Sequence, residues 1–166
     1  METYCAPVEH TFAPVCDRAS RILILGTFPS VTSRDNAFYY GHPQNRFWKV
    51  MAGVTGEAVP DTIEEKTALL LSHGIALWDV IRSCRINGSS DSSIRDVVPN
   101  DMDRVLAASP IVRIYGNGDK ACRLYERYCQ GQTGLPITRL PSTSPANAAF
   151  TLERLVECWR RILEER

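Results

Sequence analysis

Several residue types and patterns are scarce in this 166-residue chain, and each absence excludes a class of function. No apolar run approaches the roughly 18 residues that a membrane-spanning helix needs. The segment from Met1 to Cys5 has neither the basic start nor the apolar stretch of a secretion signal. The six cysteines form no CxxC pair. We therefore expect a cytoplasmic protein with reduced thiols, no membrane association, and neither zinc nor an iron–sulfur cluster.

The chain also has no excess of positive or negative charge, and it lacks the common catalytic motifs. The 19 basic and 19 acidic residues give a net charge of zero, which argues against a protein that coats nucleic acid by charge alone. The three histidines show no metal-ligand spacing, and there is no G-x-S-x-G elbow, phosphate-binding Walker loop or G-x-G-x-x-G fingerprint. Gly116-Asn117-Gly118 is typical of a tight turn. We expect neither a metal nor a cofactor.

What the chain does contain is an alternation of apolar runs and helical periodicity, with 44% hydrophobic residues. This pattern predicts one domain over residues 1–166, an α/β three-layer sandwich with a central four-stranded, mostly parallel sheet flanked by helices. The cap signal Asp61–Glu64 begins one helix. We predict a long loop over residues 82–100. The predicted strands are 21–25, 75–78, 111–115 and 137–140, and the predicted helices are 44–52, 61–73, 101–108, 119–129 and 152–163.

The loops that follow the four predicted strands carry most of the polar and aromatic chemistry. They span Gly26–Asn45, Asp79–Asn100, Gly116–Gly118 and Pro141–Ala149. Because the carboxyl ends of parallel strands meet at one edge of a sheet, we expect these loops to converge there. The first loop is rich in amides, hydroxyls and aromatic rings and has few carboxylates, which suits the binding of a flat polar ring.

Two motifs connect these loops with a known family. The first combines G-T-F-P-S at 26–30 with H-P-Q-N-R-F-W-K at 42–49, and the second is P-S-T-S-P-A-N at 141–147. Together they resemble the uracil-DNA glycosylase superfamily, near its mismatch-specific branch, which has G-I-N-P-G and H-P-x-N-R-F-W-K. The details look most like the hypoxanthine-DNA (deoxyinosine) glycosylase branch, and the order of elements matches over nearly the whole chain.

The resemblance implies an enzyme that flips a deaminated base out of DNA and hydrolyses its N-glycosidic bond, which initiates base excision repair. Hypoxanthine is the expected base, ahead of uracil. We expect a monofunctional enzyme, because the only lysine near either motif, Lys49, falls on the helix predicted at 44–52 and is not suited to form a Schiff base. We also expect a monomer. Three alternatives stay open: a G·U mismatch-specific uracil enzyme, a non-catalytic binder of damaged bases, and an unrelated α/β hydrolase that acts on nucleosides.

Three residues are candidates for binding the base: Phe28, Tyr40 and Asp79. Tyr40 occupies the family's base-stacking position, although a buried core tyrosine is the alternative. Asp79 lies where uracil enzymes of the superfamily place a base-reading Asn, and a carboxylate would read a different edge from an amide. Its alternative role is to cap a loop.

Two positions depart from the family pattern. Phe28 stands where relatives have a catalytic Asp or Asn, and Leu140 replaces the His that stabilises the departing base. Asn45 is the best remaining catalytic candidate, positioned to orient water or contact the sugar. Its alternative role is to cap the helix predicted at 44–52, and both roles are compatible.

The second motif also predicts phosphate binding, since hydroxyls and backbone amides suit that task. Arg46 and Arg139 are additional phosphate partners, unless Arg46 forms an internal salt bridge. The candidate residues are Ser30, Ser142, Ser144 and Asn147.

Overall fold

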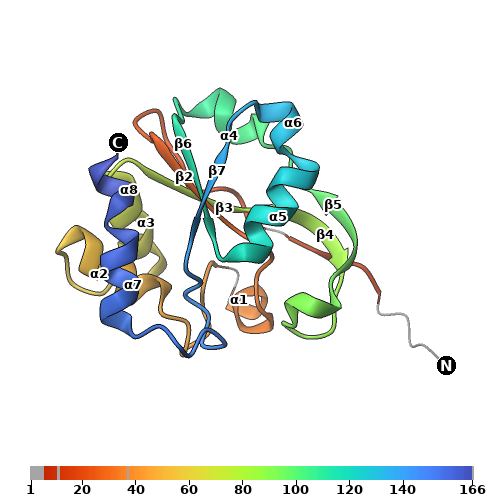
Figure 1. Ribbon diagram of the computed structural model, residues 1–166, viewed down its shortest axis with the longest axis horizontal. Helices are drawn as coiled ribbons and strands as arrows, with labels where there is room; N and C mark the ends of the chain where they lie inside the picture. The colour runs from red at the N-terminus through yellow and green to blue at the C-terminus, as the bar shows by residue number, and fades with distance from the viewer. Residues whose placement is uncertain (1–5, 11, 37, 166) are drawn as a thin grey trace.

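The computed structural model describes residues 6–10, 12–36 and 38–165, and a sheet of four parallel strands forms its centre (Figure 1). Every residue of the two strands β2 and β3 is buried, as expected for a parallel sheet covered on both faces. The predicted α/β fold with a four-stranded parallel sheet is confirmed. In sheet order the strands are β3 (Ile75–Asp79), β2 (Ile22–Gly26), β6 (Arg113–Asn117) and β7 (Ile137–Leu140).

Strand register places the ends of these strands side by side. Gly26 pairs with Asp79 across β2 and β3, and Asn117 pairs with Leu140 across β6 and β7. The sequence predicted β7 to the residue, whereas β6 begins and ends two residues later than predicted. The later end matters for the site, because it makes Asn117 the last residue of a strand.

Eight α-helices are described around the sheet. Figure 1 shows α2, α3, α7 and α8 on one side of the strands and α5 and α6 on the other. α5 packs against β6 and β7, α3 against β3, and α2 against α7. The bounds are α1 (Val31–Asn36), α2 (Phe47–Thr55), α3 (Ile63–Ser72), α4 (Asp103–Ala108), α5 (Asp119–Tyr128), α6 (Gln130–Thr133), α7 (Leu152–Trp159) and α8 (Arg161–Glu164).

Helix starts differ from the prediction for local reasons. α2 begins three residues later than predicted, since the side chain of Asn45 accepts the N–H of Phe47 and ends the preceding loop. The cap of α3 is Thr62, whose Oγ1 accepts the N–H of Glu65. Both residues lie one position after the predicted cap signal, Asp61 with Glu64. A short helix, α1, also lies within the first long loop.

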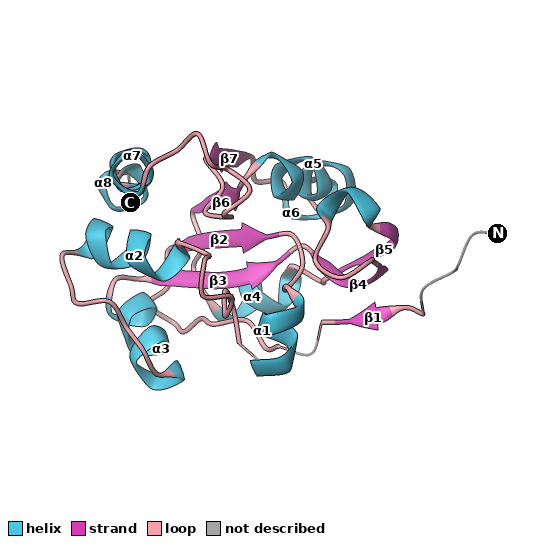
Figure 2. Ribbon diagram, turned by 90° about the horizontal axis from the view of Figure 1, so that it is seen from below, coloured by secondary structure: helices cyan, strands magenta, loops and turns pink. Residues whose placement is uncertain are grey.

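The prediction of a loop over residues 82–100 is wrong, because this segment forms part of a second sheet. Its antiparallel order is β1–β4–β5, and Figure 2 shows β2 and β3 pointing toward it. The segment is rich in Ser, Arg and Asp, so no apolar alternation revealed strands that depend on distant pairing partners. The elements are β1 (Val8–Glu9), β4 (Ile81–Arg85), the 3-10 turn η1 (Asp91–Ser93) and β5 (Arg95–Pro99).

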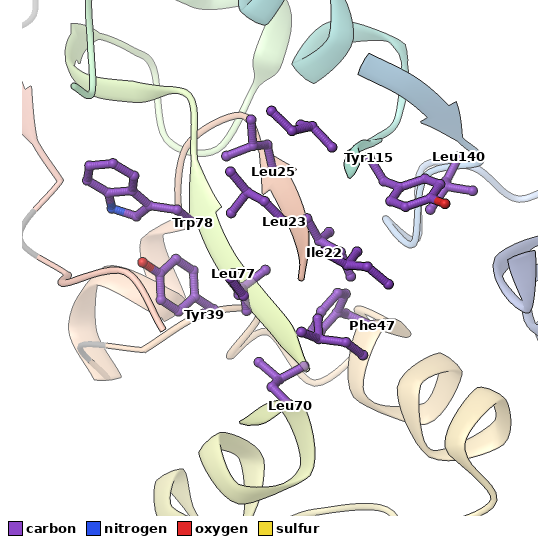
Figure 3. Packing of buried hydrophobic residues seen from close by; sticks show 14 of the residues in the cluster. Ile22, Leu23, Leu25, Tyr39, Phe47, Leu70, Leu77, Trp78, Tyr115 and Leu140 are labelled. Atoms are coloured by element: carbon purple, nitrogen blue, oxygen red, sulfur yellow. The ribbon is translucent and has the colours of Figure 1, made fainter. Parts of the chain in front are cut away.

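The hydrophobic core extends directly beneath the sheet edge where the strands end. Figure 3 shows Leu77 and Trp78 of β3 beside Leu23 and Leu25 of β2, with the ring of Phe47 at the start of α2. All of these side chains are buried. The loops at this edge are therefore anchored on a packed and rigid base.

The cysteines Cys16, Cys84, Cys122, Cys129 and Cys158 are free thiols, and Cys5 with the rest of residues 1–5 lies outside the described residues. Burial raises the pKa of Cys122 and of Cys129 to about 11, so both stay protonated at neutral pH. Among the residues that the structure describes, no helix is both long and apolar enough to cross a membrane.

Candidate active site

A cavity of about 270 Å³ opens at the carboxyl ends of the parallel strands. Each strand of the parallel sheet contributes a lining residue at or just after its end: Gly26, Asp79 and Asn117 are the last residues of β2, β3 and β6, and Ser142 follows β7. The predicted convergence of the four loops is therefore confirmed. Seven of the eight predicted site residues line this cavity, and Asn147 does not.

Gly26 allows the walls of the cavity to approach each other closely. A Cβ at this position would lie 2.7 Å from the hydroxyl of Tyr40 and closer still to Oδ1 of Asp79. Both contacts are shorter than real Cβ atoms tolerate. The glycine of the first motif is therefore required so that a carboxylate and a phenol can meet at the end of β2.

Asp79 forms a buried pair with His10, a residue that sequence reasoning did not select. Nε2 of His10 lies 2.8 Å from Oδ2 of Asp79, and the two side chains are 0% and 5% exposed. His10 follows β1, and its backbone N–H extends the pairing with β4 by donating to Arg82 at 2.7 Å. Among the described residues, the partner of the Asp79 carboxylate is therefore a distant histidine and not a loop backbone.

Aromatic rings enclose the His10 imidazole. The rings of Phe12, Phe28 and Tyr39 lie 4.9, 6.1 and 5.7 Å from it between centroids. Tyr39 donates its hydroxyl to the carbonyl of Ala13 at 2.9 Å. Burial, reinforced by the Asp79 carboxylate, raises the pKa of Tyr39 well above its ordinary value, so the phenol stays protonated.

The two aromatic candidates for base binding differ in their surroundings. Tyr40 has a positive φ of 53°, an uncommon conformation for a bulky side chain, and its ring stacks on Phe47 at 4.1 Å. Phe28 is half-buried beside His10, and the guanidinium of Arg34 lies 5.5 Å above its ring. Both line the cavity, so the alternative of a simple core tyrosine does not account for the placement of Tyr40.

Asn45 is held by a chain of hydrogen bonds whose directions are fixed. Oδ1 of Asn117 accepts the N–H of Thr143 at 3.0 Å, so its Nδ2 donates to Thr143 Oγ1, also at 3.0 Å. That hydroxyl then donates its proton to Oδ1 of Asn45 at 2.9 Å. The N–H of Phe47 donates to the same oxygen at 2.9 Å. The amide oxygen of Asn45 thus has two donors, and its Nδ2 is the group left to serve the cavity.

Arg46 holds the loop that carries the second motif. Its Nη2 donates to the carbonyls of Ser144 and Asn147 at 2.9 and 3.0 Å, and its Nη1 donates to the carbonyl of Phe150. The alternative of an internal salt bridge for Arg46 is not found among the described residues, since these partners are backbone carbonyls. Trp159 supports the same loop by donating Nε1–H to the carbonyl of Pro141 at 2.9 Å.

The serines of this loop present their hydroxyl groups at the rim of the cavity. Oγ of Ser142 accepts the N–H of Ser144 at 3.1 Å, and Oγ of Ser144 accepts the N–H of Ala146 at 3.2 Å. Each hydroxyl therefore keeps its proton for a further acceptor. Asn147 instead braces the loop by donating Nδ2 to the carbonyl of Ser142 at 3.0 Å.

Ser30 and Arg139 are less available for phosphate binding. Oγ of Ser30 accepts the N–H of Ser33 and donates to its hydroxyl, which caps the start of α1. Arg139 is exposed and pairs with Asp119 at 3.3 Å. Leu140, the position of the family's His, is 1% exposed and belongs to the core.

Among the described residues, this site holds neither a lysine nor a cluster of potential metal ligands. Among the described residues, no lysine lines the cavity, and Lys49 is exposed on α2. Within the same described ranges, no group of three or more His, Cys, Asp or Glu side chains is placed to hold a metal ion. The chemistry of the cavity is therefore that of one carboxylate, the His42 imidazole, amides and hydroxyls, and aromatic rings.

Comparison with known proteins agrees with this architecture. The family model described as the Uracil DNA glycosylase superfamily matches residues 13–163, and the chain belongs to that superfamily. A curated relative from Methanosarcina acetivorans named "Hypoxanthine DNA glycosylase" is 38% identical over 157 residues, which cover 93% of this chain and 98% of the relative. A relative of the same name from Methanosarcina barkeri is 31% identical over 137 residues, covering 82% and 86% of the two chains.

One solved structure extends the comparison to three dimensions. The NMR solution structure of a candidate uracil DNA glycosylase from Methanosarcina acetivorans matches with a TM-score of 0.76 and 34% identity. The match covers 91% of this chain and 96% of that chain. The resemblance to this superfamily that the two motifs indicated is therefore confirmed over residues 13–163.

Sequence reasoning missed three residues that organise the site: His10, Asn117 and Thr143. His10 lies 69 positions from Asp79, so no local spacing could have revealed the pair. Asn117 stood in a motif typical of a turn. Thr143 was within the second motif, but its partners are 26 and 98 positions away.

Proposed function

We propose that this protein is a monofunctional DNA glycosylase that removes hypoxanthine from deoxyinosine in DNA and leaves an abasic site. Membership of the superfamily supports glycosylase activity, and the names of the two curated relatives support hypoxanthine as the base. The observation that carries the proposal is one cavity that contains both a buried carboxylate, Asp79, and an oriented amide donor, Asn45. These groups complement a base with a ring N–H and electronegative atoms.

The reaction exchanges one bond for another. The bond between C1′ of the deoxyribose and N9 of hypoxanthine breaks, and its electron pair leaves with N9. Water adds to C1′ and loses a proton, and N9 gains a proton, so the products are hypoxanthine and an abasic sugar. Because no lysine of the described residues lines the cavity, we propose water as the nucleophile, without a Schiff base and without strand cleavage.

Asn45 has a specific part in this reaction. Its Oδ1 already accepts two hydrogen bonds, so it is poorly placed to take a proton from water. Its Nδ2–H groups can instead donate toward the departing base or sugar, where preorganised donors stabilise the charge that develops. The fixed network holds the donor in place before the substrate arrives, and the transition state then requires little reorganisation.

The presence of Phe28 in the first motif is consistent with a donor role for Asn45. A phenyl ring cannot activate water, and we propose that the barrier falls mainly through stabilisation of the leaving group. Hypoxanthine suits such a site because it leaves more readily than adenine. We propose that Phe28 and Tyr40 contact the faces of the flipped base, whereas Asp79 accepts a hydrogen bond from its edge.

The rim of the cavity provides contacts to the DNA backbone. We propose that Ser142 and Ser144 donate their hydroxyl protons to phosphates beside the flipped nucleotide, with Asn147 bracing their loop. Ser30 belongs to the same proposal as a weaker contact, since it caps α1. We propose that the protein acts as a monomer in the cytoplasm.

A cleavage assay tests the proposal. Labelled duplexes with one deoxyinosine, one deoxyuridine opposite guanine, or no lesion are incubated with the protein, and half of each sample is heated in alkali. We expect strand breaks from the deoxyinosine duplex only after alkali. Breaks before alkali would contradict the monofunctional mechanism, and faster release of uracil would favour a mismatch-specific uracil enzyme. Binding without release of any base would identify a damaged-base binder.

A further inference from the structure

We infer that His10 determines which edge of a base the cavity accepts, by holding Asp79 as a hydrogen-bond acceptor for a ring N–H. The inference rests on the proposed function and names the substrate class of the same site. His10 does not line the cavity, so it acts as a positioning residue through Asp79. The class comprises bases with a ring N–H beside a carbonyl, such as 6-oxopurines and uracil.

The protonation of His10 follows from its two hydrogen bonds. The backbone N–H of Phe12 donates to Nδ1 of His10 at 3.1 Å, so Nδ1 carries a lone pair and no proton. The ring proton of the neutral imidazole must therefore be on Nε2, which donates to Oδ2 of Asp79 at 2.8 Å. The imidazole consequently acts as a donor to Asp79, and Oδ2 is an acceptor.

The surroundings of His10 preserve this arrangement. Its side chain is fully buried, with the rings of Phe12, Phe28 and Tyr39 against it. A ring flip would remove both hydrogen bonds and leave two buried polar groups without partners, which is costly. The direction of the bond to Asp79 is therefore a fixed property of the fold.

The second carboxylate oxygen is the one that can read a base. Asp79 lines the cavity, and its Oδ1 lies on the side of Gly26 and Tyr40, which line it too. With Oδ2 bound to His10, Oδ1 attracts the N1–H of hypoxanthine or the N3–H of uracil. Adenine has an unprotonated nitrogen at N1, so its lone pair would face the carboxylate and binding would be disfavoured.

The change in preference between two substrates tests this interaction, because their difference at O6 is the same for every variant. Deoxyinosine has N1–H and O6, whereas the deoxyriboside of unsubstituted purine has an unprotonated N1 and adds no bulk. The measured quantity is the ratio of single-turnover cleavage rates on duplexes that contain one or the other. Because each variant is compared with itself on two substrates, a general loss of activity cancels from the ratio.

Asp79→Asn changes the acceptor to a donor at constant shape. The Nε2–H of His10 will bind the oxygen of the introduced amide, so the amide NH₂ will face the cavity. We expect the preference for deoxyinosine to fall by about 100-fold, the scale of a lost hydrogen bond to a charged group.

His10→Gln and His10→Phe form a matched pair. Both lose the acceptor for the Phe12 N–H, but only His10→Gln has an amide N–H that can still donate to Asp79. We expect His10→Gln to keep the wild-type preference within about threefold and His10→Phe to lose at least about tenfold of it. Circular dichroism checks folding, and Asp79→Asn alone decides the outcome if His10→Phe does not fold.

The outcomes separate this inference from the proposed function. If wild-type protein releases hypoxanthine but Asp79→Asn keeps the wild-type ratio, the inference is overturned and the proposed function stands. If His10→Gln and His10→Phe change the ratio equally, the role of the His10 donor is overturned. A wild-type protein that releases no hypoxanthine would overturn both.

Discussion

The hydroxyl of Thr143 donates to Oδ1 of Asn45 at 2.9 Å, although 98 positions separate the two residues in the chain. This bond joins the first motif to the second and fills the amide oxygen that Phe47 also uses. An amide side chain can accept or donate hydrogen bonds. Because the oxygen of Asn45 is occupied, the group that Asn45 offers to the cavity is its NH₂ donor. The following predictions depend on this orientation and on the loop that provides it.

Asn45→Asp distinguishes a donor from a group that activates water. A carboxylate keeps both hydrogen bonds to Oδ1 but offers no N–H to the cavity, so we expect single-turnover cleavage of deoxyinosine to fall by about 100-fold. The cleavage rate of Asn45→Ala should fall at least as far, while the affinity for uncleaved duplex changes little in either variant. Gln44→Ala, which alters an exposed neighbour, is the control. Wild-type rates in Asn45→Asp would show that Asn45 works as an acceptor.

Asn117→Asp reverses the direction of the hydrogen bond between residue 117 and the Thr143 hydroxyl without changing the shape of the side chain. Both carboxylate oxygens accept, so the Thr143 hydroxyl will donate to the introduced carboxylate and will leave Oδ1 of Asn45. We expect roughly tenfold slower cleavage, with a similar loss in Thr143→Val, because the amide is no longer held in one orientation. Thr143→Ser retains the hydroxyl and should stay near the wild-type rate. Equal rates in Thr143→Val and Thr143→Ser would contradict a role for this hydroxyl.

Arg46→Met removes the donors that hold the second-motif loop. Its guanidinium binds the carbonyls of Ser144, Asn147 and Phe150, so we expect a loss of about 2–3 kcal/mol in the free energy of unfolding. Urea denaturation gives this value, and hydrogen exchange should increase over residues 143–150. Arg139→Met, which removes an exposed ion pair, should leave the urea midpoint unchanged. Unaltered exchange in the loop would contradict the assigned contact.

Ser142→Ala tests the phosphate contact. Its hydroxyl proton is one of two serine donors available at the rim, so we expect roughly five- to tenfold weaker binding to a lesion duplex. The cleavage rate at saturating protein should change less than binding. Ser30→Ala provides a comparison, because that hydroxyl is engaged in capping α1. Binding is measured on a duplex with a non-hydrolysable deoxyinosine analogue. A loss in rate with unchanged binding would assign Ser142 to the chemical step.

The strands and loops that form the site were predictable because their signals are local. The run that becomes β2 is continuously apolar, and β3 ends at Asp79, so the convergence of their loops followed from topology. The two motifs also contain five of the seven predicted site residues that line the cavity. Periodicity and spacing carry this kind of information within one element or one loop.

The polar contacts were not predictable because they depend on distant pairs. The position of His10 is set by the pairing of β1 with β4, a sheet that the polar segment after β3 concealed. Asn117 can be recognised as a site residue only from the structure, in which β6 ends at this residue. Likewise, the sequence could not reveal that Arg46 binds carbonyls, because backbone acceptors have no signature of their own.

Arg46 and Asn45 are neighbours in the chain, and both bind the loop that carries Ser142 and Ser144. If this loop shifts, the amide of Asn45 must shift with it. If Ser142 and Ser144 bind phosphate as proposed, the distance from that phosphate to the scissile bond is set inside the protein before DNA arrives. A nucleotide that fits the loop is consequently already in register with Asn45, and a backbone with altered phosphate spacing will be cleaved slowly even when its base fits the cavity.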